Sequence, residues 1–246
     1  KELHVGHLRN ICLGNSLANL FENNGFKVTR VNYLNDFGAH VAKCLWGLKK
    51  FHDKEKPPRN RQKWLGEIYT QASRYLKEHP EAQEEVVQMQ QKMEAKDKSI
   101  WSLYLQTKQW SIEGFEKFFK DLGVKHKDVF YEKETKFVGQ KMVDKLLQKG
   151  IAQVGEGGAI IVDLNKYGLD IALLRKSNGA GLYLTSDLGL AVAKNKKYKV
   201  NESIHLTGIE QNLYFKQLFK ILDLAGYKYK MTHIGYGLVT LPSGKM

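Results

Sequence analysis

The tetrapeptide His4-Val5-Gly6-His7 opens a run of apolar residues with helical spacing. This spacing predicts an amphipathic helix formed by Leu8, Ile11, Leu13, Leu17, Leu20 and Phe21. The first turn of a helix presents free N–H groups and the positive end of the helix dipole, which suits a triphosphate. A glycine there lets the backbone approach a ligand, and imidazoles can donate hydrogen bonds to phosphate oxygens. Taken alone, the four residues fit a helix start with two incidental histidines equally well.

A strand is predicted directly after this helix. Gly25 fits the position that follows a helix end, and residues 27–34 alternate and are rich in β-branched side chains. A helix and a strand that leave a phosphate-binding turn predict an α/β fold of the Rossmann type, with a doubly wound parallel sheet. Residues 35–38 would form the loop at the carboxyl end of the strand, where such sheets bind ligands. A second helix is predicted over residues 39–51.

The character of the sequence changes between residues 52 and 123. Pro57-Pro58 interrupts the chain, and the segment beyond is polar, rich in Lys, Glu and Gln, and helical in pattern. We therefore predict a first half of the Rossmann domain over 1–51, a helical insertion over 52–123 and a second half over 124–246. The apolar stripes of the insertion, which are more typical of a core than of a binding surface, comprise Trp64, Ile68, Tyr75, Trp101, Leu105, Trp110 and Phe118.

The second half returns to alternating strands and helices. Strands are predicted at 129–131, 171–175, 203–207 and 231–234. Helices are predicted at 136–148 and 211–225, and a further helix is predicted to begin at Thr185 or Ser186 as its cap and to end at about 195. Residues 151–154 and 159–163 predict a hairpin around a glycine-rich turn. A phosphate-binding P-loop does not fit that turn, because no Lys-Ser/Thr pair follows it.

Composition and charge restrict the class of protein. The 246 residues are 42% hydrophobic, enough for a proper core, and contain no apolar run long enough to span a membrane. Lys and Arg exceed Asp and Glu by 39 − 26 = 13, which favours a polyanionic partner. Cys12 and Cys44 match no metal site and are expected to be buried free thiols in a reducing cytoplasm. The chain lacks an initiator Met and a signal peptide, so we interpret it as part of a longer protein.

Asp187 is a candidate for recognition of a cation. It is expected in the first turn of a helix, close to Tyr183, where a carboxylate can simply stabilise the helix dipole. Alternatively, it can pair with a guanidinium, whose planar fork of donors matches the two oxygens of a carboxylate.

Polar residues also follow two predicted strands. Gly208 permits close backbone approach to a ligand, and Glu210, Gln211 and Asn212 would line the carboxyl edge of the sheet, although one of them could serve only as a helix cap. Asp36 lies in the loop after strand 27–34 and is a further candidate for lining the site.

Five segments together resemble one enzyme family, the arginyl-tRNA synthetases of class I. Residues 1–10, KELHVGHLRN, resemble the family's form of the "HIGH" signature, and residues 238–246 resemble the approach to its "KMSKS" loop. Residues 182–187 and 208–215 resemble segments in which a Tyr, an Asp and a Gln contact arginine. Residues 31–38 resemble the N-x-x-G-D-W-G loop, with Asn35 in place of Gly and Phe37 in place of Trp, and neither change removes a charge.

The resemblance implies an arginine–tRNA ligase that forms arginyl-adenylate from ATP and passes arginine to the 3′ end of tRNA(Arg). The catalytic groups would be His4, His7 and Lys245. ATP would be bound by His4, Gly6, His7, Gly208, Glu210 and Lys245, and Mg²⁺ would arrive with it, without a structural metal. Arginine would be bound by His7, Tyr183, Asp187, Gln211 and Asp36. A cytoplasmic monomer without membrane contact is expected.

The chain lacks several parts of this family. The S-P-N segment, the rest of the "KMSKS" loop and the anticodon-binding domain are absent, so we expect weak or no activity from these residues alone. Two alternatives remain open. One is another class I aminoacyl-tRNA synthetase or a nucleotidylyltransferase with a similar histidine motif, and the other is a non-enzymatic RNA-binding module suggested by the charge of +13.

Overall fold

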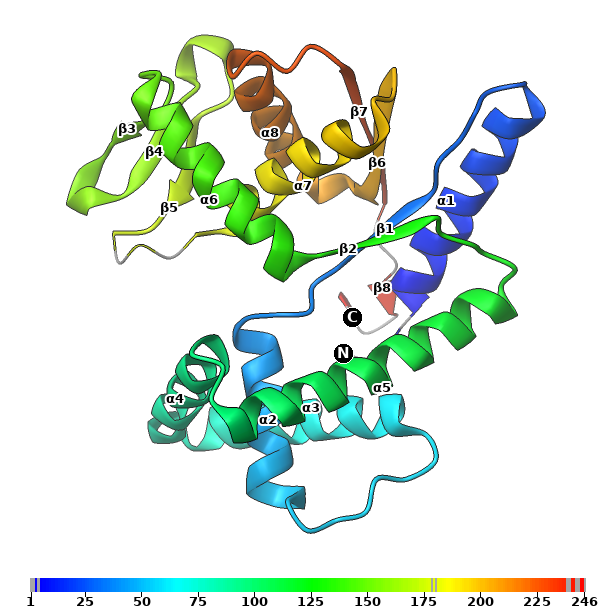
Figure 1. The fold of residues 1–246 in the computed structure, drawn as a ribbon, viewed down its shortest axis with the longest axis vertical. Coiled ribbons are helices and arrows are strands. Elements are labelled where there is room, and N and C mark those ends of the chain that lie inside the picture. Colours follow the sequence, from blue (N-terminus) through cyan, green and yellow to red (C-terminus); the bar gives the residue numbers. More distant parts are fainter. Residues whose placement is uncertain are drawn as a thin grey trace. The chain divides into compact units, whose positions relative to one another are not determined.

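The computed structural model of the chain describes residues 3, 5–177, 179 and 181–237, and the backbone alone of 240–241 and 244–245. The chain divides into two compact units (Figure 1). Unit 1 comprises Lys1–Arg30 and Asn35–Lys127, and unit 2 comprises Val31–Leu34 and Asp128–Met246. Each unit has a hydrophobic core of its own.

Unit 1 is built from helices. These are α1 (Val5–Asn23), α2 (Ala39–His52), α3 (Arg61–Glu78), a short 3₁₀ turn η1 (Pro80–Ala82), α4 (Gln83–Glu94) and α5 (Lys98–Asp121). Two of the helix starts are capped as their sequences favour: the Asn60 side chain accepts from the backbone N–H of Lys63, and Asp97 accepts from those of Ser99 and Ile100. The helical pattern predicted beyond residue 52 is therefore present, and α2 packs on α3 and α4 in the same unit.

The aromatic side chains of unit 1 form much of its core, as their helical spacing indicates. Trp64 and Trp110 are both buried, with ring centroids 6.3 Å apart, and Tyr104 is 1% exposed. Leu105 is an exception, since it is 49% exposed and lies outside the core. Burying each large apolar side chain is worth about 1.5–3 kcal/mol. One core cluster joins α2 to α3, η1, α4 and α5 through Ala42, Leu45, Trp46, Ala72, Ala82, Val86, Met93, Ile100 and Tyr104.

Helix α1 contributes little to that core. Ala18 is buried, whereas Val5 and Leu8 are 44% and 36% exposed, and Cys12 lies on the same exposed face. The prediction of a buried thiol is therefore wrong for Cys12, because the amphipathic pattern does not determine which face is covered. Cys44 is half-buried, and burial raises the pKa of its thiol to about 11. Both cysteines are free thiols.

Unit 2 has two pairs of parallel strands. Strand β1 (Val31–Leu34) pairs with β2 (Asp128–Tyr131), and β6 (Glu202–Gly208) pairs with β7 (Lys230–Tyr236). Helices α6 (Glu132–Gln148), α7 (Tyr183–Tyr198) and α8 (Asn212–Leu224) connect or cover them. Parallel strands joined through helices confirm the predicted α/β class. The prediction of a strand from residue 27 was too long, because only four residues find partners on β2 and Arg30 is held by Glu22 and Asn19 of α1.

The predicted hairpin is part of an antiparallel sheet. Strand β3 (Gln153–Val154) pairs with β4 (Ile160–Asp163), which pairs with β5 (Ile171–Arg175). The turn between β3 and β4 contains η2 (Glu156–Gly158) and requires glycine, since φ is 65° at Gly157 and 85° at Gly158. Two further 3₁₀ turns are η3 (Asn165–Tyr167) and η4 (Ile209–Gln211). Near the end of the chain, β8 (Thr240–Leu241) pairs antiparallel with β9 (Gly244–Lys245).

Helices α6 and α7 touch backbone to backbone, and Figure 1 shows them side by side. A Cβ atom at Gly139 would fall 1.8 Å from the carbonyl oxygen of Thr185, and one at Gly189 would fall 1.9 Å from that of Thr135. Glycine is therefore required at both positions, and this contact fixes the first turns of α7 against α6. The core beneath them includes Val143, Leu146, Leu164, Leu174, Leu184, Leu188, Phe215, Leu218, Ile221 and Leu222.

Candidate active site

Helix α7 begins earlier than its sequence suggests. Its first residue is Tyr183, so Thr185 and Ser186 are not the cap but lie buried inside the first turn. The Thr185 hydroxyl donates a hydrogen bond to the carbonyl of Leu174 on β5, which ties the helix to the antiparallel sheet. As a consequence, Asp187 lies in the second turn of the helix, and the expectation of a first-turn position is wrong. The helix dipole acts mainly within the first turn, so it gives this carboxylate little support.

Asp187 is a half-buried carboxylate with a neutral hydrogen-bond donor. The hydroxyl of Tyr214, in the first turn of α8, donates to its Oδ2 atom. Burial raises the pKa of Asp187, while the Tyr214 hydrogen bond and the positive charge of Lys194 partly offset this effect. Burial and the charge of Asp187 in turn raise the pKa of Tyr214, which therefore stays a donor.

Other elements of unit 2 also face this carboxylate. The Tyr33 hydroxyl of β1 lies 3.3 Å from the hydroxyl of Thr135 on α6. Burial raises the pKa of Tyr33, and the negative charges of Asp187 and Glu132 raise it further. Strand β1 and helices α6, α7 and α8 therefore all place polar side chains in the surroundings of Asp187.

Tyr183 and Gln211 lie on the elements that frame Asp187. Tyr183 is 60% exposed and stands one helical turn before Asp187, so both share one face of α7. Gln211 is half-buried at the end of η4, directly before the helix that carries Tyr214. This arrangement leaves one aromatic ring accessible beside a partly buried negative charge, which suits a planar cation.

The carboxyl end of β6 is tightly built. Gly208 is buried there, and a Cβ atom at this position would lie 2.3 Å from the carboxylate oxygens of Glu210. Glu210 itself is exposed on η4. Gly208 and Glu210 therefore lie together at the predicted ligand-binding edge of the sheet. A side chain at position 208 would displace the Glu210 carboxylate, so this position requires glycine.

Asp36 is engaged in the helical unit. Its carboxylate lies 2.6 Å from the ammonium of Lys108 and accepts a hydrogen bond of 3.1 Å from the hydroxyl of Tyr104, both on α5. The side chain is 6% exposed. The ion pair fixes the loop after β1 to α5, which is a structural role that the sequence does not reveal.

The remaining predicted groups lie at the two ends of the chain. Gly6 and His7 occupy the first turn of α1, as the motif predicts, and both are half-buried. His4 lies outside the described residues. For Lys245 the structure describes the backbone within β9, and its pairing with Thr240. His7 and Asp36 belong to unit 1, whereas Tyr183, Asp187, Gly208, Glu210 and Gln211 belong to unit 2.

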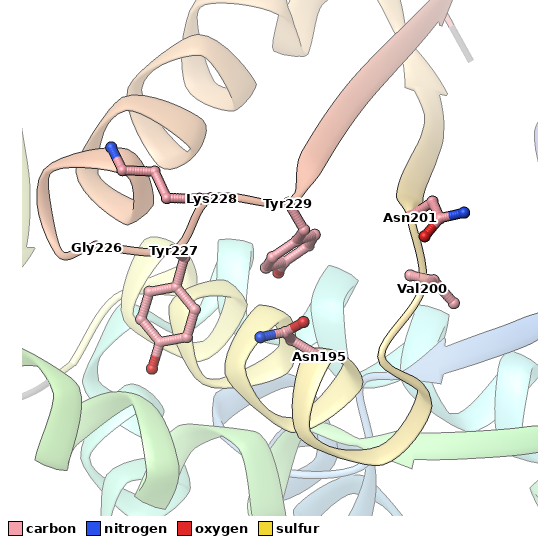
Figure 2. A pocket seen from close by; sticks show the side chains of 7 residues that line it. All are labelled: Asn195, Val200, Asn201, Gly226, Tyr227, Lys228 and Tyr229. Atoms are coloured by element: carbon pink, nitrogen blue, oxygen red, sulfur yellow. The ribbon is translucent and has the colours of Figure 1, made fainter.

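A hollow of about 580 Å³ opens elsewhere in unit 2 (Figure 2). It lies where β6 and β7 begin, the opposite end from Gly208, and contains none of the predicted site residues. Figure 2 shows the side chains of Tyr227 and Tyr229, which lie in the segment between α8 and β7, pointing toward the helix that carries Asn195. The described part of the chain holds no cluster of three or more His, Cys, Asp or Glu suited to a metal ion. No helix in that part is long and apolar enough to cross a membrane.

Sequence reasoning missed three residues around Asp187. Tyr214 donates to it, Tyr33 faces it from β1, and Lys194 interacts with it electrostatically. A signal existed for Lys194, which follows Asp187 by seven residues and therefore shares its helix face. Tyr214 lies inside the segment already singled out, but its pairing with a residue 27 positions earlier depends on tertiary structure.

The chain is similar to known proteins over its whole length. Residues 1–245 match the family described as tRNA synthetases class I (R), catalytic domain. The arginine–tRNA ligase of Bdellovibrio bacteriovorus is 34% identical to the chain, and the match covers 100% of this chain and 44% of that protein. The arginine–tRNA ligase of Treponema denticola is 35% identical, and the match covers 100% of this chain and 43% of that protein. The chain thus spans less than half the length of these relatives. The crystal structure of arginyl-tRNA synthetase from Plasmodium falciparum shares the fold, with a TM-score of 0.79, 23% identity and coverage of 97% of this chain and 41% of that one.

Proposed function

Because the chain belongs to the family of class I tRNA synthetase (R) catalytic domains, we propose that it is the amino-acid-activating part of an arginine–tRNA ligase. Its substrates are L-arginine, ATP and tRNA(Arg). The carboxylate of arginine attacks the α-phosphorus of ATP, the bond to the bridging oxygen breaks, and arginyl-adenylate and pyrophosphate form. Arginine then passes to the terminal ribose of the tRNA, and AMP leaves. The work of the protein in such transfers is positioning and stabilisation of charge.

The observation that carries the proposal is the setting of Asp187. A partly buried carboxylate, without a cation at ion-pair distance among the described residues, faces neutral tyrosine hydroxyls. A guanidinium offers the missing positive charge and can bind both carboxylate oxygens at once. Tyr183 and Gln211 would complete the arginine site, the first as a ring against the planar cation and the second as a hydrogen-bonding amide.

ATP is assigned to the helix start and to the edge of β6. His4, Gly6 and His7 would bind the phosphates at the first turn of α1, with His7 also approaching arginine, and His4 and His7 would stabilise the transition state. Gly208 and Glu210 would contact the nucleotide, and Lys245 would assist from the opposite end of the chain. Mg²⁺ would enter as part of the ATP substrate. Asp36 stays a predicted arginine contact, beside the structural ion pair already described.

The net charge of +13 supports tRNA as the macromolecular partner. We further propose that the protein acts as a monomer in the cytoplasm, where its two thiols stay reduced.

The test is ATP–pyrophosphate exchange by the whole protein that contains these residues, with each of the twenty amino acids, with and without tRNA. Arginine alone should support exchange. Replacing His7 by Ala should reduce the rate by about 10²-fold or more while leaving the circular dichroism spectrum unchanged, because a positioned donor to transition-state charge is worth about 3 kcal/mol. Exchange driven by a different amino acid would overturn the arginine assignment. RNA binding without exchange would favour a non-enzymatic module instead.

A further inference from the structure

The loop between α2 and α3 in unit 1 lies within the most basic stretch of the chain. Residues 49–63 contain seven Lys or Arg and two acidic residues, so they carry 7 − 2 = 5 of the net charge of +13. No other stretch of fifteen residues in the sequence carries as much. The loop itself, residues 53–60, is exposed throughout, and Figure 1 shows it as an open connection between the end of α2 and the start of α3.

The two acidic residues of the loop are held at the end of α2. The Asp53 carboxylate lies 3.3 Å from the ammonium of Lys49, and the Glu55 carboxylate lies 2.8 Å from Nδ1 of His52. Both partners belong to the last turn of α2. The acids of the loop are therefore engaged with the helix that precedes it.

The basic residues fall into two groups. Those on the flanking helices have carboxylate partners on α3, α4 or α5, and the pairs are Lys50–Glu85 at 3.1 Å, Arg61–Glu113 at 3.8 Å and Lys63–Glu67 at 3.7 Å. Lys54, Lys56 and Arg59 of the loop have no ion pair with any of the described residues. Three positive charges are therefore left unbalanced on one short loop.

The ends of this loop are fixed between the two helices. Nε2 of His52 lies 2.8 Å from the side-chain oxygen of Gln71 on α3, and the His52 ring meets the ring of Trp64 edge to face, with centroids 5.9 Å apart. At the other end, Asn60 caps α3. Pro57-Pro58 in the middle restricts the backbone further, because each proline ring fixes φ. A loop held in this way loses less conformational entropy when it binds a partner.

We propose that this loop binds the phosphate backbone of the tRNA through Lys54, Lys56 and Arg59. The inference rests on the proposed function, which supplies tRNA as the polyanionic partner. An ammonium meets a phosphate as a point charge, and a guanidinium can bind two phosphate oxygens at once. Each such contact releases counterions from the RNA, which favours binding at low salt.

The composition of the loop favours phosphate contacts over base recognition. Residues 53–60 contain no aromatic side chain on which a base could stack, and the side-chain oxygen of Asn60, the one amide of the loop, accepts from the backbone of Lys63. The loop should therefore bind cognate and non-cognate tRNA equally well, since phosphates carry no sequence information. An anionic membrane fits less well, because the loop has no large apolar side chain to insert.

The experiment measures binding of fluorescently labelled tRNA to the whole protein by anisotropy, between about 50 and 200 mM salt. The test protein carries Lys54→Gln, Lys56→Gln and Arg59→Gln together, which removes the three charges from an exposed loop. Each neutralised phosphate adds about 0.7–0.9 to the slope of log affinity against log salt, so the slope should become shallower by about two to three. Affinity at 0.1 M salt should fall at least about tenfold, for tRNA(Arg) and for a non-cognate tRNA alike.

The control removes the same charge from other parts of unit 1. It combines Lys77→Gln, Lys92→Gln and Lys98→Gln, which lie exposed on α3, α4 and α5 outside the basic stretch. This variant should keep the salt slope of the unaltered protein. In aminoacylation, the loop variant should raise the KM for tRNA at least about tenfold and leave kcat and the KM for arginine unchanged, because the loop contacts neither the arginine nor the ATP site as proposed.

The outcomes separate this inference from the proposed function. An unchanged salt slope in the loop variant, or an equal loss in the control, would overturn the loop as a tRNA contact, even if the protein activates arginine. Loss of affinity for tRNA(Arg) alone would overturn the phosphate assignment, because it would indicate base recognition. Loss of binding to phosphatidylserine-containing vesicles with unchanged tRNA binding would favour a membrane partner and overturn the proposal. Loop-dependent tRNA binding by a protein that shows no arginine-dependent exchange would support this surface and reject the proposed activity.

Discussion

Asp36 and Asp187, both expected to contact arginine, have opposite electrostatic settings. Asp36 in unit 1 is 6% exposed and is paired with the Lys108 ammonium at 2.6 Å. Asp187 in unit 2 accepts a hydrogen bond from the neutral hydroxyl of Tyr214, and the positive charge of Lys194 acts on it from beyond ion-pair distance. The first carboxylate has its charge balanced within the fold, while the charge of the second remains available.

This difference separates a carboxylate that holds the fold together from one that can hold a ligand. A buried ion pair gains little net stability, but removing one partner is costly, so such a pair fixes its elements in place. A half-buried carboxylate with neutral donors carries an unmet cost of desolvation, which a cationic ligand can remove. The residue type is the same in the two cases, and the partners decide the role.

The largest expected effect is on arginine binding by Asp187→Asn, which keeps the shape but removes the charge. Loss of a charge pair in a closed pocket costs about 2–5 kcal/mol, so the KM for arginine should rise about 30- to several-thousand-fold. The KM for ATP should change little, because the proposed phosphate contacts lie at the start of α1. Steady-state kinetics of the whole protein with tRNA measures both constants.

The matched variant is Asp36→Asn, which makes the same chemical change in the other setting. It should alter the KM for arginine much less than Asp187→Asn, and its main effect should be on stability. Equal increases in KM for the two variants would show that Asp36 also contacts the substrate, and the contrast between the two carboxylates would then be wrong.

The next effect concerns stability in unit 1. Lys108→Met leaves the Asp36 carboxylate buried without its cation, which should lower the free energy of unfolding by about 1–3 kcal/mol. Urea denaturation followed by circular dichroism measures this. Lys117→Met on the same helix is the control, because its ion pair with Asp121 is 76% and 59% exposed and should contribute less than about 1 kcal/mol. A loss no larger than that of the control would contradict a structural role for the Asp36 pair.

A smaller effect is expected from Tyr214→Phe. The variant removes the hydroxyl that donates to Asp187 but keeps the ring. A hydrogen bond of this kind contributes about 0.5–1.5 kcal/mol, so the KM for arginine should rise about threefold to tenfold. The pKa of Asp187 should also rise, since this bond lowers it. NMR titration of the Asp187 carboxyl carbon tests the second point, and an unchanged pKa would exclude Tyr214 as the group that orients the carboxylate.

Local patterns predict the elements that carry these residues, but not their partners. The alternation of β6 and β7 and the apolar period of α2 and α8 identify those elements from a few neighbouring residues. The start of α7 is different, because Thr185 fits a helix cap by its chemistry yet gives its hydroxyl to Leu174, eleven positions earlier. Family resemblance supplies Asp187 and Gln211, whereas the Tyr214 and Lys108 contacts join residues 27 and 72 positions apart.

The same limit applies to burial. The period of α1 predicts that Leu8 and Leu13 share an apolar helix, and both are nevertheless exposed at 36% and 40%. A hydrophobic period shows which residues can be covered together, but the coverage depends on what packs against the helix. Cys12 is exposed for the same reason.

The smallest expected effect is a gain in stability from Asp187→Asn at neutral pH. Burial raises the pKa of Asp187 above its usual value, so the folded protein holds this proton more tightly than the unfolded chain does. The charged carboxylate therefore costs stability at pH 7, and the cost disappears as the pH falls through the raised pKa toward the ordinary value near 3.8. The uncharged Asn avoids this cost.

Thermal unfolding should show a higher Tm for Asp187→Asn than for the unaltered protein at pH 7, and this difference should narrow in acid. The control is the exposed Asp144→Asn on α6, whose free energy of unfolding should stay within about 0.5 kcal/mol of that of the unaltered protein at both pH values. A lower Tm for Asp187→Asn at pH 7 would mean that Tyr214 and Lys194 already stabilise the charge more than burial penalises it, and the distinction from Asp36 would then be one of degree.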